Sequence, residues 1–89
     1  MEEIDDFCAD FSEKLHKNIG KNVKRIRQEK KISQLKLAYA LGYKSVSPIS
    51  SAEIYYNKIH FHIEQLAKIS LVLEVNICEF FKDAIPNDT

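Results

Sequence analysis

Glycine and proline are scarce in this sequence, with two of each among 89 residues. Because these residues interrupt regular structure most strongly, their scarcity and the apolar residues at steps of three and four predict an all-α fold. Cysteine is equally scarce, and Cys8 and Cys78 form no C-x-x-C pair. We therefore interpret both cysteines as small apolar side chains and expect no disulfide.

Long apolar runs are missing as well. None approaches the roughly 20 residues that a membrane-spanning helix needs. The N-terminus is acidic where a signal peptide would be basic, so we expect a cytoplasmic protein without a membrane partner. No nucleophile–base set or glycine-rich phosphate loop stands out, so we expect no enzyme, no cofactor and no small-molecule substrate. His60 and His62 lack a third ligand, which argues against a metal site.

The formal net charge is zero, but the charges are unevenly distributed. Residues 1–17 carry six acids against two bases, and residues 73–89 carry four acids against one base. Residues 18–72 carry ten bases against three acids. A basic middle between acidic ends suits a polyanionic partner, although such charges also occur on ordinary solvated surfaces.

The apolar spacing predicts the first elements and their limits. Residues 4–31 form either one long helix or two helices, and we expect a break or bend near Asn18–Gly20 because a glycine interrupts the pattern there. Ser33 is a good N-cap for the following helix. Gly42 is a plausible residue for ending that helix in a left-handed conformation.

A third helix follows, and Ser45 or Ser47 is its expected N-cap. Pro48 is acceptable only in the first turn of this helix, where its missing N–H group is not needed. We expect the helix to extend to about Tyr55 and to be closed by Asn57 in a left-handed conformation.

The remaining segments complete a helical chain. Residues 57–62 are expected to form a loop, and residues 63–73 form a strongly apolar fourth helix. Asn76 caps a short last helix that holds Ile77, Phe80 and Phe81.

Ala38 and Gly42 are spaced as in a helix-turn-helix. The small residue permits a second helix to approach, and the glycine four residues later permits a sharp turn between the two helices. The ordered residues around this pair are Ile19-Gly20-Lys21, Arg27 to Gln34, Leu37-Ala38, Leu41-Gly42, Ile49-Ser50, Glu53, Leu66-Ala67-Lys68-Ile69 and Leu73-Glu74-Val75. This set, which spans about residues 19–82, resembles the Cro/XRE-type, lambda-repressor-like helix-turn-helix family.

The chain departs from the family pattern in three places. It has an extra residue between Gly42 and Glu53, and the loop after Glu53 lacks the usual glycine and is about two residues longer. Pro48 is unusual at its position. These departures lie beside the residues that the resemblance would assign to base contacts.

The resemblance implies a five-helix lambda-repressor-like DNA-binding domain over residues 18–83. An acidic N-terminal helical extension (residues 1–17) precedes it, and a flexible tail (residues 84–89) follows it. The implied function is a sequence-specific regulator of transcription that binds double-stranded DNA as a homodimer, with the second helix of the pair in the major groove. The alternative is a protein-interaction module on the same fold, similar to an antitoxin or an inhibitor.

The resemblance also assigns candidate site residues. The implied base-contacting residues are Lys44, Ser45, Val46, Ser47, Ser50 and Ser51. The implied phosphate-contacting residues are Gln34, Arg27, Lys36 and Lys58. We expect Glu53 to orient a neighbour, with Arg27 as the candidate partner in an internal ion pair. The serines could instead serve only as helix caps and solvent contacts.

A chain this short has difficulty covering all its aromatic residues alone. Two groups are therefore candidates for the dimer surface: Ile77, Phe80 and Phe81 in the last helix, and Phe7 and Phe11 in the acidic N-terminal helix.

Overall fold

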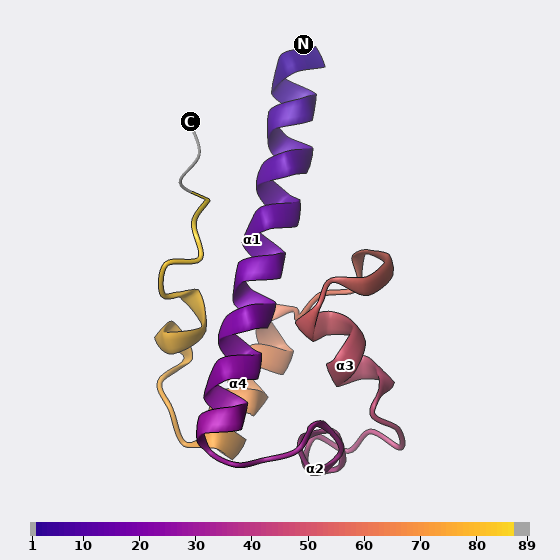
Figure 1. The fold of residues 1–89 in the computed structure, drawn as a ribbon, viewed down its shortest axis with the longest axis vertical. Coiled ribbons are helices and arrows are strands. Elements are labelled where there is room, and N and C mark those ends of the chain that lie inside the picture. Colours follow the sequence, from indigo (N-terminus) through magenta and orange to yellow (C-terminus); the bar gives the residue numbers. More distant parts are fainter. Residues whose placement is uncertain (1, 87–89) are drawn as a thin grey trace.

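The computed structural model describes residues 2–86, and it describes the side chains from residue 9 onward. Within this range the chain forms four α-helices and two 3-10 turns without any strand (Figure 1), which confirms the predicted all-α class. The elements are α1 (Glu2–Glu29), α2 (Gln34–Ala40), α3 (Ser47–Glu53), η1 (Tyr56–Lys58), α4 (Ile63–Leu73) and η2 (Ile77–Phe81). Of the helices in residues 2–86, none combines the length and apolar character needed to cross a membrane.

The long helix α1 is continuous from Glu2 to Glu29, so the predicted break near Asn18–Gly20 is wrong and the single-helix alternative is right. Gly20 is buried where the end of α3 packs against α1. A Cβ atom at Gly20 would lie 2.5 Å from the carbonyl oxygen of Glu53 and 2.8 Å from that of Ala52. This glycine therefore permits two helices to approach closely and does not end a helix.

The core lies between α1 and the later elements. Its fully buried large side chains are Val23, Leu37, Ile49, Leu66, Ile69, Leu73 and Phe80. The C-terminal segment runs beside α1 (Figure 1). The Asn22 side chain donates to the backbone oxygens of Phe80 and Lys82, and the Asn18 side chain donates to that of Ala84, each at 2.9 Å.

Two sequence predictions for this C-terminal segment need correction. Phe80 has no exposed surface and belongs to the core, so it is not available as a dimer contact. Ala84 is also buried, so residue 84 packs with the domain and not with a flexible tail. Of the other predicted dimer residues, Phe81 is exposed, Ile77 and Phe11 are half-buried, and the Phe7 side chain lies outside the described residues. Cys78 is exposed and free, and the Cys8 side chain also lies outside the described residues.

The predicted helix caps agree with the structure at two of three sites. The Ser33 hydroxyl accepts the Lys36 N–H at 3.0 Å, and the Asn76 side-chain oxygen accepts the Cys78 N–H at 2.8 Å. At α3, however, the N-cap is Val46, and no side chain caps the helix. Pro48 lies in the first turn of α3, as predicted. The sequence thus identified the turn that starts α3 but assigned its cap wrongly to Ser45 or Ser47.

The connection from α3 to α4 departs furthest from the prediction. Helix α3 ends at Glu53, and Tyr55 already has a left-handed conformation, with φ of 59°. Asn57 is left-handed as predicted, with φ of 54°, but it lies inside η1 and does not close α3. Lys58 also has a positive φ of 65°. Three residues of this connection, which contains no glycine, therefore adopt the left-handed conformation that glycine adopts most readily.

Candidate nucleic-acid interface

A tight turn built on Gly42 joins α2 to α3. Gly42 has φ of 89°, a conformation that favours glycine, and its N–H group donates to the Tyr39 carbonyl at 3.0 Å. The Tyr43 N–H group donates to the Ala38 carbonyl at 2.9 Å. These two bonds form a Schellman motif, which ends α2 and turns the chain toward α3, as the sequence predicted.

The turn is fixed to the fourth helix through Tyr43. The Gln65 side chain donates to the Tyr43 hydroxyl at 2.8 Å and accepts the His62 N–H at 3.0 Å. One glutamine therefore connects the α2–α3 turn to the start of α4. This bridge fixes the segment directly before α3, where the first base contacts are predicted.

Helix α3 buries one side and exposes the other. Ile49, Ala52 and Glu53 face the interior, whereas Ser47 is exposed and Ser50 and Ser51 are half-buried. Ser47, Ser50 and Ser51 are spaced by three and four residues, so they share one side of the helix. Together with the turn residues Lys44, Ser45 and Val46, they form the surface that we call the serine face.

The serine face carries little internal bonding among the described residues. Lys44 and Ser45 are exposed, and Lys44 makes no ion pair with any described side chain. The Ser50 hydroxyl donates to the Ser47 carbonyl at 3.4 Å, which is a long contact. All six predicted base-contacting residues thus lie together on this accessible segment.

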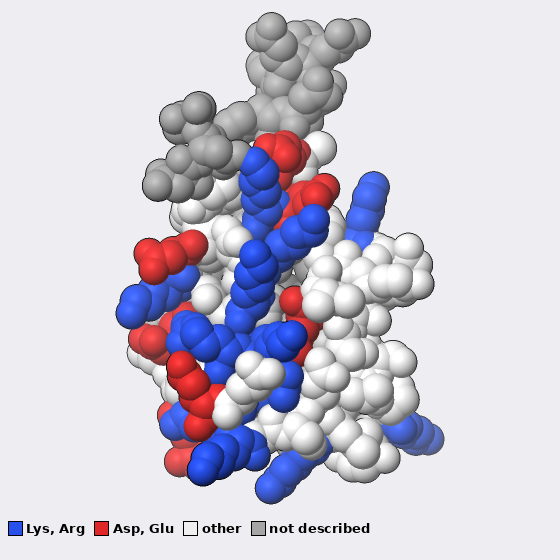
Figure 2. Space-filling model, viewed as in Figure 1, with Lys and Arg blue, Asp and Glu red and all other residues white. Residues whose placement is uncertain are grey.

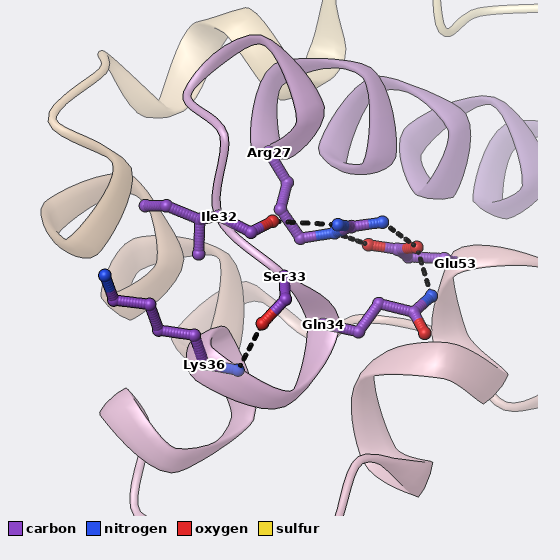
Figure 3. Close-up of polar contacts among 6 residues, drawn as sticks. All are labelled: Arg27, Ile32, Ser33, Gln34, Lys36 and Glu53. Carbon is purple, nitrogen blue, oxygen red and sulfur yellow. Dashed lines mark hydrogen bonds and ion pairs between the residues drawn. The ribbon is translucent and has the colours of Figure 1, made fainter.

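A buried polar network holds the other end of α3 against α1 (Figure 3). The Arg27 guanidinium contacts the Glu53 carboxylate through two bonds, Nε–Oε2 at 2.8 Å and Nη2–Oε1 at 3.1 Å. Its Nη1 donates to the Ile32 carbonyl at 2.9 Å, and the Gln34 amide donates to Glu53 Oε1 at 2.8 Å. The predicted internal pair between Arg27 and Glu53 is therefore confirmed.

This network corrects the predicted phosphate contacts. The Arg27 side chain is 7% exposed and satisfied within the protein, so Arg27 positions α3 and is not placed to bind a phosphate. The Gln34 amide donor is directed to Glu53 (Figure 3), although Gln34 is the first residue of α2. Lys36 and Lys58 are exposed without an ion pair to any described residue, so they remain accessible to an anion.

Sequence reasoning missed a row of lysines on α1. Lys17, Lys21 and Lys24 are exposed and line a hollow beside Glu53 and Ile54 at the end of α3. Figure 2 shows Lys and Arg side chains gathered along α1 at the centre of this face. Their spacing of four and three residues was a signal in the sequence, but the packing of α3 against it was not.

An aromatic cluster joins α1 to the α3–α4 connection. The His16 and His60 rings stack with centroids 3.8 Å apart, and Tyr55 lies 6.0 Å from His16 in a parallel arrangement. Burial, and secondly the neighbouring His60, lower the pKa of His16 below its usual 6.5. His62, by contrast, lies at the start of α4, and the described residues contain no group of three side chains suited to a metal ion.

Comparison with known proteins adds no relative: no family model, no curated protein and no solved structure matches the chain.

Proposed function

We propose that the protein is a sequence-specific regulator of transcription that inserts α3 into the major groove of double-stranded DNA. The observation that carries this proposal is the division of α3 into an accessible serine face and a base held by the Arg27–Glu53 pair. A helix that reads bases must be rigidly positioned yet leave its outer side free. Among the described residues, this helix combines both properties.

The chemistry of the serine face suits base edges. A serine hydroxyl both donates and accepts, so it can pair with several base edges, and the Val46 side chain can contact a thymine methyl group. Lys44, at the start of this face, supplies a positive charge beside the groove. Because serine discriminates bases weakly, the shape and deformability of the DNA contribute to specificity.

Lys36 and Lys58 place further positive charge before and after α3 in the chain, and both are exposed. We propose that they contact phosphates, which fix the register of the protein on the duplex without reading its sequence. A homodimer would present two such helices to half-sites about one helical turn apart. The exposed Phe81 is a candidate for the contact between subunits.

A protein-interaction module is the second candidate function, and one observation favours it. Ile54, Tyr56 and Ile63 are 60–65% exposed, and they lie at the C-cap of α3, in η1 and at the first residue of α4. Where exposed apolar side chains form a contiguous patch, they are typical of protein contact surfaces. In this second candidate, the protein acts by binding a partner protein through these side chains, and its function does not need DNA binding.

Selection of bound sites from a random duplex library tests the proposal, with sedimentation to measure the oligomeric state. We expect enriched sites with two similar half-sites, and we expect Lys44→Ala to weaken binding and to lower its salt dependence. Lys68→Ala, on the exposed surface of α4, is the matched control. Absence of any enriched sequence, together with co-purification of a protein partner, would reject DNA reading in favour of the second candidate.

A further inference from the structure

The lysine row on α1 is a concentrated positive surface outside the serine face. Lys17, Lys21 and Lys24 are separated by four and three positions, so their side chains project from the same side of the helix. They line a hollow of about 260 Å³, whose other lining residues are Glu53 and Ile54. We call these three residues the α1 lysine row.

The charge of this row is largely uncompensated by its own helix. The residues three and four positions from Lys21 are Lys17, Asn18, Lys24 and Arg25, and none of them is acidic. The corresponding neighbours of Lys24 are Gly20, Lys21, Arg27 and Gln28, and again none is acidic. Of the three lysines, Lys17 is the one with an ion pair among the described residues, since it pairs with Glu13 at 2.8 Å on an exposed surface.

The nearby Glu53 does not neutralise the row. Its carboxylate is buried, and both of its oxygens accept hydrogen bonds from Arg27 or Gln34. Like charges at these helical spacings repel one another, so the repulsion among the three lysines lowers the stability of the free protein. A polyanion bound along the row would relieve this repulsion.

The position of the row indicates which polyanion fits. Ile54 is the C-cap of α3 and is exposed, so the hollow lined by the lysines adjoins the end of the helix that carries the serine face. Seven residues of α-helix span about 10 Å, and the major groove is about 12 Å wide. A duplex that receives α3 in its groove therefore has a phosphate ridge close to the end of the helix.

We propose that the α1 lysine row binds the phosphate backbone beside the groove that α3 occupies, which rests on the proposed function. The row contributes affinity and orientation but reads no bases, because it contacts only phosphates. Its binding is consequently sensitive to salt, with each phosphate contact adding about 0.9 to the slope of log affinity against log salt concentration.

The test compares two double variants that remove the same charge. Lys21→Gln/Lys24→Gln removes the two lysines of the row that make no ion pair with a described residue, and Lys30→Gln/Lys68→Gln removes two exposed lysines that do not line the hollow. Binding of each protein to a duplex selected by the wild type is measured between 50 and 200 mM salt. Thermal unfolding checks that both variants fold.

We expect the row variant to lower the salt slope by about 1.8, to unfold at the same or a higher temperature, and to retain the base preference of the wild type. The control variant should keep the wild-type slope.

Equal effects of the two variants, or an unchanged slope in the row variant, would overturn the assignment. Loss of self-association in the row variant with an unchanged slope would overturn it in favour of a contact between two copies. If the wild type shows no salt-sensitive duplex binding, the proposed function fails as well, so the two failures are distinguishable.

Discussion

The pair formed by Arg27 and Glu53 connects α1 to α3, and its removal is the sharpest test of how the serine face is held. The two side chains are 7% and 0% exposed, and they share two hydrogen bonds. Arg27→Met keeps a long side chain but leaves the buried Glu53 carboxylate with only the Gln34 amide as a side-chain donor. Because an uncompensated buried charge is costly, we expect the free energy of unfolding to fall by about 3–5 kcal/mol.

A double-mutant cycle separates this pair from general packing. Glu53→Met leaves the Arg27 charge buried and should be similarly destabilising, whereas Arg27→Met/Glu53→Met removes both charges. We expect the double variant to be more stable than the sum of the single effects predicts, by about 2–3 kcal/mol. Urea unfolding followed by circular dichroism measures all four proteins.

The chain offers a matched control on the same helix. Arg25 pairs with Glu29 at 3.3 Å, and the two side chains are 47% and 60% exposed. Because water screens such a pair, Arg25→Met should cost less than about 1 kcal/mol. If Arg27→Met costs no more than Arg25→Met, or if the effects in the cycle are additive, the Arg27–Glu53 pair does not hold α3 against α1.

Three further predictions concern packing, pH and capping. Gly20→Ala gains about 1 kcal/mol of helix propensity but forces a Cβ atom against α3, so thermal unfolding should show a net loss of about 1–3 kcal/mol; a stabilised variant would contradict the close packing. Because burial, and then the nearby His60, lower the pKa of His16, the unfolded chain takes up this proton more readily. The free energy of unfolding therefore keeps its full value above about pH 6.5 and decreases as the pH falls below it. The difference between the free energies of urea unfolding at pH 7.5 and at pH 5.5 should be smaller in His16→Phe than in the wild type. An equal difference in both proteins would argue against His16 as the cause. Ser33→Ala should cost about 1 kcal/mol in urea unfolding, against little change for Ser12→Ala at an exposed site; equal costs would deny the cap.

Much of the fold was predictable because its signals are local. The hydroxyl of Ser33, the side chain of Asn76 and the φ of 89° at Gly42 each act within a few residues, so the sequence alone located these helix ends. The periodic apolar residues of 63–73 likewise predicted α4 at its exact bounds. The pairing of Arg27 with Glu53, which are 26 positions apart, came from family resemblance and not from any local pattern.

The errors occurred where tertiary contacts override local signals. Gly20 looks like a helix breaker, but only the packing of α3 shows that it is a point of close approach. Phe80 looks like a surface aromatic in a short terminal helix, yet α1 and α4 enclose it. Tyr55 and Lys58 adopt left-handed conformations that their residue types disfavour, so no local rule predicted the loop after α3.

The same limit applies to the candidate site. The six residues of the serine face are consecutive or nearly so, and sequence reasoning therefore found them together. The α1 lysine row was missed because its relation to α3 depends on how α1 and α3 pack. The sequence assigned Arg27 two roles, a phosphate contact and an ion pair with Glu53, and the burial of its side chain decides for the ion pair.

If the exposed side of α3 reads bases, removing hydroxyls from that side should change the base preference of the protein. Ser47→Ala/Ser50→Ala removes two hydroxyls from the serine face, and site selection from a random duplex library compares this variant with the wild type and with Ser12→Ala as control. We predict relaxed preference at one or two base pairs of each half-site, by about 1–3 kcal/mol per lost contact, with the remaining positions unchanged. Identical preferences in all three proteins, or no enriched sequence for the wild type, would contradict the account.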